Sequence, residues 1–270
     1  MAYQISDKTA PIIIFVGPSQ AGKSMVLVRI AKYLYTKGYS VQACRNYIDT
    51  NDYQQACDEF DAALTSNQAL PGTVTDLLVQ IRKTNGDIVA QMLEAPGEHF
   101  FNPANPQQAV PGYLQHICGG AVQNKKCFIH ILDFDSNPKS PEQSLRNNST
   151  IRDLYAKRLI NVIKPFARKI DRHILLYNKI DLTPYGTTHE CKNFGGALRD
   201  AEQNYSYVFA NMKKKILGGL FTVDDFVFLP FSTGTYSENY DDMGDILSKD
   251  YNISSDIYPE KLWNEITRRF

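Results

Sequence analysis

A segment of eight residues near the start of the chain constrains the fold more than any other feature. Residues 17–24 read Gly-Pro-Ser-Gln-Ala-Gly-Lys-Ser and match the pattern G-x-x-x-x-G-K-[ST] in full. An apolar run precedes the segment, and a pattern typical of a helix follows it. Glycines let such a loop wrap tightly, so that backbone N–H groups and the start of the next helix face an anion. The segment is therefore predicted to bind phosphate groups.

This pattern assigns a role to most residues of the loop. We expect the Lys23 ammonium to reach the β- and γ-phosphates of a nucleotide, and the Ser24 hydroxyl to bind Mg²⁺. The other nucleotide contacts are expected from Gly17, Ser19, Gln20, Ala21 and Gly22.

Apolar runs that alternate with amphipathic stretches predict an α/β fold with a mostly parallel sheet. Six strands are expected, at residues 11–16, 76–82, 87–93, 126–133, 173–177 and 226–231. Thr84-Asn85-Gly86 separates the second strand from the third, and Asn-Gly favours a tight hairpin because both residues tolerate positive φ. The sheet should therefore contain one antiparallel edge strand.

Flanking helices are expected at residues 23–36, 52–65, 145–170, 196–217 and 259–270. Asp52 is predicted to cap the second helix, and Pro165 to kink or end the third. No repeat or linker divides the sequence, so residues 1–270 are expected to form a single domain.

Composition excludes several classes of function. Lys plus Arg and Asp plus Glu each number 29, so the net charge is zero and no global field attracts nucleic acid or an anionic membrane. The five cysteines lack the C-x-x-C spacing of a metal or redox site. The N-terminal residues lack the apolar core of a signal peptide, and no apolar run approaches the ~20 residues of a membrane helix. We expect a cytoplasmic protein that does not span a membrane.

Asn178-Lys179-Ile180-Asp181 directly follows the fifth expected strand. Together with the phosphate loop, this N-K-x-D box makes the chain resemble the Ras-like P-loop GTPase superfamily. The resemblance implies a G domain that binds GTP or GDP with Mg²⁺, in which Asp181 accepts hydrogen bonds from N1–H and the exocyclic amine of guanine. Asn178 would brace the loop, and the Lys179 side chain would lie along the base. Adenine offers no such donor pair, so an unpaired carboxylate there would cost ~1–3 kcal/mol.

The family's D-x-x-G box corresponds to Glu-Ala-Pro-Gly at residues 94–97. The resemblance implies that Gly97 donates its N–H to the γ-phosphate and that Glu94 faces Mg²⁺. Glu94 stands where the family has an aspartate, and the extra methylene changes its reach toward the metal.

Two further family features fall in the expected order. The S-A-K box corresponds to residues 232–234, where Ser232 and Thr233 would lie beside guanine. The threonine that closes over Mg²⁺ in the family would be Thr73, with Thr75 as the alternative.

The implied reaction is GTP + H₂O → GDP + phosphate. Ras-like enzymes have a glutamine directly after the box glycine, whereas this chain has Glu98 and His99, either of which could orient water. Arg45 could act as an arginine finger or be an ordinary solvated side chain. These departures predict slow hydrolysis that a protein partner accelerates through the segments 65–76 and 94–112. The alternatives are a nucleotide-binding scaffold with little or no hydrolysis, and an ATP-dependent kinase, which N-K-I-D argues against.

Three other segments lead to expectations about the surface. Phe100 and Phe101 suggest an aromatic contact surface on a long second switch, or else packing beneath the loop. The basic residues between 157 and 172 are expected on the exposed face of a helix, and the acidic stretch 238–250 as a solvated loop.

Overall fold

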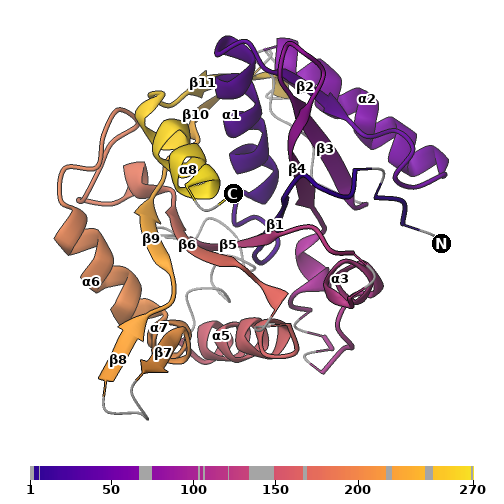
Figure 1. Cartoon of the computed structure of the whole chain (residues 1–270). Helices are drawn as coiled ribbons and strands as arrows, with labels where there is room; N and C mark the ends of the chain where they lie inside the picture. Colours follow the sequence, from indigo (N-terminus) through magenta and orange to yellow (C-terminus); the bar gives the residue numbers. More distant parts are fainter. Residues whose placement is uncertain are drawn as a thin grey trace.

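A seven-stranded sheet organises the chain (Figure 1). The computed structural model describes residues 3–5, 7–66, 75–102, 104–105, 107–120, 122–133, 149–166, 169–216, 221–240, 246–268 and 270. The spatial order of the strands is β2 (Ser40–Ala43), β3 (Leu77–Arg82), β4 (Ile88–Glu94), β1 (Ile12–Val16), β5 (Lys126–Asp133), β6 (Arg172–Asn178) and β9 (Val227–Pro230).

Most neighbouring strands of this sheet are parallel. β1 pairs in parallel with β4 and β5, β5 with β6, and β6 with β9. β3 is antiparallel to both of its neighbours, β2 and β4. All five side chains of β1 are fully buried, because a central strand with helices on both faces has no solvated side. The core therefore surrounds the strand that leads into the phosphate loop.

Helices flank the sheet, and in Figure 1 α1 and α8 lie on one side of it while α3, α5 and α7 lie on the other. The described helices are α1 (Lys23–Thr36), α2 (Asn51–Thr65), α3 (Gly112–Cys118), α5 (Ser149–Ile163), α6 (Phe194–Asn204), α7 (Ser206–Asn211) and α8 (Ile257–Thr267). Two small hairpins, β7 (Lys213–Ile216) with β8 (Phe221–Asp224) and β10 (Gly234–Tyr240) with β11 (Ile246–Ile253), lie outside the main sheet. None of the helices in the described ranges is both long and apolar enough to cross a lipid bilayer.

The predicted fold class is confirmed, and each of the six predicted strands is present. The Asn-Gly turn joins β3 to β4 as expected, with Gly86 at φ 90°. The seventh strand, β2, pairs with β3 at the edge, so the antiparallel strand is the penultimate one rather than the edge strand. Within β2 only Val41 is buried, and this is why no apolar run marked it in the sequence.

The helix predictions were partly wrong. α1 begins and ends as predicted, and α5 ends at Ile163, just before Pro165. Thr50 rather than Asp52 caps α2, because its hydroxyl accepts a hydrogen bond from the Tyr53 N–H at 3.3 Å. The predicted helix 196–217 is instead two helices and a strand, since Tyr205 leaves helical geometry at φ −125° and ψ 35°.

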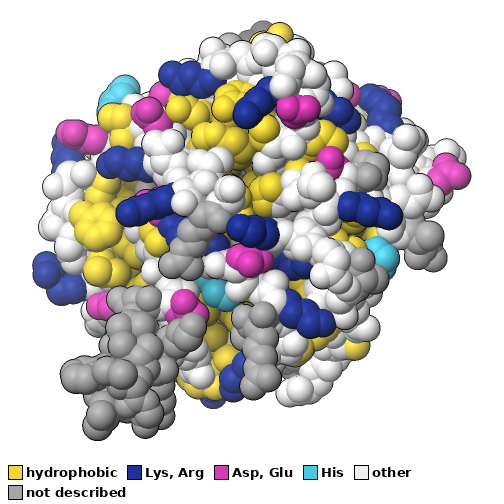
Figure 2. Space-filling model, in the orientation of Figure 1, with side chains coloured by type: hydrophobic (Ala, Val, Ile, Leu, Met, Phe, Trp, Pro, Cys, Tyr) yellow, Lys and Arg dark blue, Asp and Glu magenta, His cyan; other side chains and the backbone are white. Residues whose placement is uncertain are grey.

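The acidic stretch 238–250 was also predicted wrongly, because its described residues belong to strands β10 and β11 rather than to a loop. The prediction failed because the described residues pair through their backbones as an antiparallel hairpin, which a run of charged residues does not signal. On the face that Figure 2 shows, basic and acidic side chains are interspersed among hydrophobic ones.

Candidate nucleotide-binding site

The predicted phosphate loop, residues 17–24, and the base loop, residues 178–181 with the N-K-x-D box, meet at one edge of the sheet. Because β1, β4, β6 and β9 run in the same direction, their carboxyl ends lie together, and a loop follows each of them. The crevice outside the carboxyl ends of parallel strands is where open α/β sheets bind ligands. Residues 17–24, 94–99, 178–182 and 231–234 all belong to this edge.

The phosphate loop wraps tightly into α1. Gly22 adopts φ 90° at the start of the helix, and Gln20 has φ 59°, the left-handed region that favours glycine. The Val26 N–H donates to the Gly22 carbonyl at 2.9 Å, which continues the helix back into the loop. No side chain of the described residues caps α1, so its first N–H groups can face an anion. Lys23 is 5% exposed, and its ammonium donates to the Pro18 carbonyl at 3.0 Å across the loop.

Asn178 joins the base loop to the phosphate loop. Its side-chain amide donates to the Ala21 carbonyl at 2.9 Å, although the two residues are 157 positions apart. A Cβ on Gly22 would lie only 2.5 Å from the same amide nitrogen, so this contact requires glycine at position 22. The Asn178 Oδ1 atom is buried and has no hydrogen-bond partner among the described residues. The two loops therefore form one structural unit.

The rest of the N-K-I-D box lies against the loop after β9. Lys179 adopts φ 59°, and Ile180 donates its N–H to the Phe231 carbonyl at 3.0 Å. This turn leaves Asp181 half-buried, with no hydrogen bond to its carboxylate from the part of the chain that the structure describes. Ser232 and Thr233 are both buried beside it. The base loop and the loop after β9 are thus close enough to border one ligand.

Arg29 of α1 extends this connection. Its guanidinium is 1% exposed and lies 2.6 Å from a carboxylate oxygen of Asp256. The same group donates to the Ser254 carbonyl at 2.7 Å, and the Ser254 hydroxyl donates to the Ser232 carbonyl at 2.7 Å. The helix that starts in the phosphate loop is therefore fixed to the loop after β9.

Residues of the D-x-x-G box contact the phosphate loop from the other side. Glu94 is fully buried at the end of β4, and its Oε1 atom accepts a hydrogen bond from the Ser24 hydroxyl at 3.3 Å. A Cβ on Gly97 would lie 1.9 Å from the Ser19 nitrogen, so only glycine permits this approach of the two backbones. Glu94 was predicted to face Mg²⁺ and Gly97 to contact the γ-phosphate, and both lie beside the loop.

Oxygen donors at this point suit Mg²⁺. The Ser24 hydroxyl and the Glu94 carboxylate are neighbours, whereas no group of three His, Cys, Asp or Glu side chains among the described residues could hold a metal. A magnesium ion here would therefore depend on phosphate oxygens as well as on protein oxygens. Thr73 lies outside the described residues, while Thr75 is described and half-buried.

Of the two predicted catalytic residues, only His99 has a charged partner in the described part of the chain. Its Nδ1 atom lies 3.3 Å from Oδ1 of Asp76, which is 5% exposed, and the histidine side chain is 40% exposed. The Glu98 side chain is exposed. Sequence reasoning missed Asp76, and the available signal was a carboxylate directly before the apolar start of β3.

Buried phenols surround the Asp76 carboxylate. The Tyr47 and Tyr113 hydroxyls have no hydrogen-bond partner among the described residues. Burial, and next the negative charge of Asp76, raises the pKa of each phenol well above its usual value. Both phenols therefore stay protonated, and each is a potential hydrogen-bond donor beside the carboxylate.

For Phe100, Phe101 and Arg45 the structure agrees with the second of the two alternatives left open, whereas the expectation for Arg158 was wrong. Phe100 and Phe101 are buried rather than part of a contact surface. Arg158 of α5 is buried rather than exposed, because its guanidinium donates to the Phe100 carbonyl at 3.1 Å and to the Ala109 carbonyl at 3.3 Å. Arg45 is not available as a finger in this arrangement, since it forms ion pairs at 2.8 Å with two carboxylates of α2, those of Asp58 and Asp61.

No protein-family model and no curated protein matches the chain. Among solved structures, it is similar to the S. cerevisiae Ski7 GTPase-like domain bound to GDP and inorganic phosphate, with 17% identity, a TM-score of 0.42, and coverage of 83% of this chain and 43% of that chain. For the signal recognition particle receptor SRb-GTP/SRX complex from Chaetomium thermophilum, the values are 13% identity, 0.40, and 96% and 100% coverage. The chain thus spans about half the length of the Ski7 structures, 43% and 50% in two of them.

Both TM-scores lie below 0.5. The topology of the chain itself is more specific, since the phosphate loop follows β1, the D-x-x-G-like box follows β4, and N-K-I-D follows β6 at one sheet edge. The chain has a mostly parallel α/β fold in which the phosphate loop leads from the central strand β1 into α1.

Proposed function

We propose that residues 1–270 form one G domain that binds GTP or GDP with Mg²⁺ and hydrolyses GTP slowly. The observation that carries the proposal is the contact of Asn178 with Ala21 and Gly22. It joins a loop suited to phosphates and a loop suited to guanine into one continuous surface. A sequence match in either loop alone would not require the two to touch.

Each end of the nucleotide has candidate contacts. Lys23 and the N–H groups at residues 17–24 would bind the phosphates, which favour a helix N-terminus. Asp181 would accept hydrogen bonds from guanine, with Lys179, Ser232 and Thr233 at the sides of the base. Because the Asp181 carboxylate has no hydrogen bond within the described residues, its acceptor capacity is available to a base.

Mg²⁺ would neutralise charge on the β- and γ-phosphates. Ser24 and Glu94 would hold it on the protein side, and the bond between them supports this pairing. Thr73, or Thr75, would complete the set when GTP is bound. Gly97 would donate its N–H to the γ-phosphate.

Hydrolysis requires a water molecule aligned with the γ-phosphate. We infer that His99 orients this water and that Asp76 positions the histidine ring, because a buried carboxylate oxygen lies 3.3 Å from its Nδ1 atom, although the described residues make no hydrogen bond to either atom. Glu98 is the second candidate. Intrinsic turnover should be ~10⁻⁴–10⁻² s⁻¹, as in GTPases without an activator, and a protein partner that contacts the segments 65–76 and 94–112 would accelerate it.

Calorimetry of nucleotide binding tests the proposal. We expect GTP and GDP to bind at least tenfold more tightly than ATP and ADP, because adenine cannot pair with Asp181. Asp181→Asn should shift the preference toward xanthine nucleotides, and Lys23→Ala should weaken every nucleotide. Equal affinity for GTP and ATP would exclude the guanine assignment. Tight GTP binding with no single-turnover hydrolysis would leave the scaffold as the function.

A further inference from the structure

A cavity lies at the amino-terminal ends of the parallel strands, opposite the candidate nucleotide site. Its volume is about 870 Å³, and it is bounded by the end of α1, the start of β4 and the second half of α8. Pro11 lines it at one end of β1, while the phosphate loop follows the other end. Five strand residues at about 3.3 Å each separate the two places by roughly 17 Å. The cavity is therefore distinct from the proposed nucleotide site.

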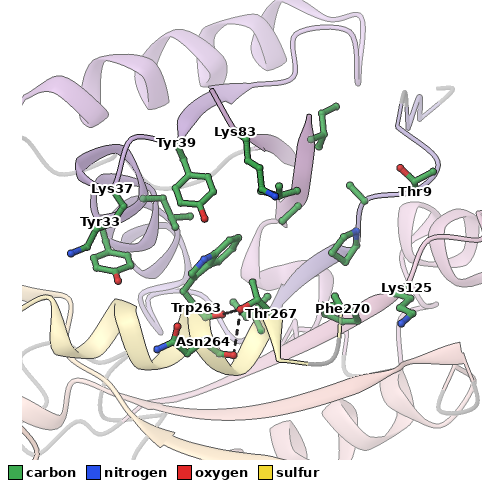
Figure 3. A pocket seen from close by; sticks show the side chains of 17 residues that line it. Thr9, Tyr33, Lys37, Tyr39, Lys83, Lys125, Trp263, Asn264, Thr267 and Phe270 are labelled. Atoms are coloured by element: carbon green, nitrogen blue, oxygen red, sulfur yellow. Dashed lines mark hydrogen bonds between the residues drawn. The ribbon is translucent and has the colours of Figure 1, made fainter. Parts of the chain in front are cut away.

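Three lysines from three different parts of the fold gather around this cavity. Lys83, from the β3–β4 turn, extends toward its middle, and Lys37 and Lys125 lie on two sides of it (Figure 3). All three side chains are exposed at the rim. None of the described residues that line the cavity is acidic. A cavity with this lining concentrates positive potential in a molecule whose net charge is zero.

Aromatic side chains form much of the cavity wall. Tyr39 and Trp263 meet edge to face with ring centroids 6.1 Å apart. The Lys37 ammonium lies 5.2 Å from the centroid of the Tyr33 ring, and the Lys125 ammonium lies 5.8 Å from that of Phe270. Contacts of this kind attract a cation to a ring face and help to orient it. The cavity thus combines oriented positive charge at its rim with planar apolar surface inside.

We propose that this cavity binds a small organic anion that carries several negative charges on an aromatic or similarly flat apolar body. The anionic groups would contact Lys37, Lys83 and Lys125, and the body would lie against Tyr39 and Trp263. Lys83 extends toward the middle of the cavity, whereas the Lys37 and Lys125 ammonium groups lie at its rim near the Tyr33 and Phe270 rings. The volume also lies within the ~300–1,000 Å³ typical of small-molecule sites. This inference does not depend on the proposed GTPase activity.

Pyranine, a fluorescent pyrene that carries sulfonate groups, is a suitable probe. Its fluorescence anisotropy on titration with the full chain should show saturable binding that weakens as salt is added. Lys83→Gln and Lys37→Gln should each weaken binding about tenfold, because each removes one charge-assisted contact. Lys261→Gln is the matched control, since Lys261 is exposed on α8 but does not line the cavity. Unchanged affinity in both cavity variants would overturn the proposal.

Two further arms identify the site and the ligand class. Lys23→Ala alters the phosphate loop and should leave pyranine affinity unchanged, whereas loss of binding in that variant would place the probe at the loop and overturn the proposal. Inorganic triphosphate has several negative charges but no ring. It should therefore displace pyranine at least tenfold less well than other pyrene sulfonates do. Equal displacement would overturn the part of the proposal that assigns an apolar body to the ligand.

Discussion

Gly97 shows that one residue can determine whether two backbone segments of the candidate site approach each other. Alanine at this position would place its Cβ 1.9 Å from the Ser19 nitrogen, so one of the two backbones would have to move. We expect Gly97→Ala to destabilise the protein by about 1–3 kcal/mol and to weaken GTP more than GDP. Urea unfolding and nucleotide titration measure the two effects. Gly112→Ala is the matched control, because a Cβ there has no atom within 4 Å. Equal behaviour of the two variants would contradict this account.

Asp76 and His99 should act as a pair if the histidine orients the attacking water. His99→Ala is expected to slow single-turnover GTP hydrolysis about 10²-fold, and Asp76→Asn about tenfold, with GDP affinity unchanged in both. In the double variant, Asp76→Asn should cause no further loss, since there is no ring left to hold. If the two rate reductions multiply in the double variant, Asp76 acts independently of His99, for instance on folding alone.

At the scale of elements, α5 holds the segment that follows the D-x-x-G-like box. Arg158 donates to two carbonyls of that segment, at residues 100 and 109. Arg158→Leu should therefore speed amide hydrogen exchange across residues 100–109 about tenfold, because charged hydrogen bonds that oppose local opening are lost. Lys157→Leu, at the exposed neighbouring position, should leave exchange unchanged. Slow exchange in both variants would mean that other contacts order this segment.

Elements with strong internal patterns could be predicted from sequence, and those that depend on distant partners could not. β1 and α1 follow directly from an apolar run and from helical periodicity. β2 has one buried apolar residue and is a strand only because β3 offers it a pairing edge. Likewise, Arg158 was predicted to be an exposed cation because its two carbonyl partners lie 58 and 49 positions away in the sequence.

The candidate site was predictable for a related reason. Residues 17–24 and 178–181 were each expected directly after a strand of a mostly parallel sheet, and the structure places both segments at the carboxyl ends of parallel strands. Asp76 was not predicted, since its significance comes from His99 and from two tyrosines that approach it from other segments. Local sequence patterns therefore predict the loops, but not the side chains from other segments that contact them.

At the scale of the whole molecule, two buried histidines make stability depend on pH. His130 and His173 stack with ring centroids 5.4 Å apart, and Nε2 of the first lies 3.2 Å from Nδ1 of the second. Burial lowers the pKa of both, to about 4 for His173. Above pH ~6.5 both are neutral in either state. As the pH falls from ~6.5 to ~4, the unfolded chain gains protons that the folded protein cannot, so stability decreases.

Each histidine should contribute up to ~1.4 kcal/mol of lost stability per pH unit in that window. Urea unfolding of the protein and of His173→Phe at pH 7, 6 and 5 gives the slope of the free energy of unfolding against pH. We expect a shallower slope for the variant. His189→Gln, at an exposed position, should keep the slope of the original chain. An unchanged slope in His173→Phe would mean that His173 takes up protons in the folded state.

The bonds from Arg29 to Ser254 and Asp256 also bear on the order of events during synthesis. The three residues are in contact in the folded molecule, yet Arg29 is more than 220 positions away from the other two in the sequence. A ribosome releases the N-terminal part first. Until residue 256 emerges, α1 carries a guanidinium that its final position would bury without a partner, and such burial is strongly disfavoured. The helix that begins in the phosphate loop is therefore translated before most of the other described elements, but its contacts through Arg29 can form only after Ser254 and Asp256 have been translated.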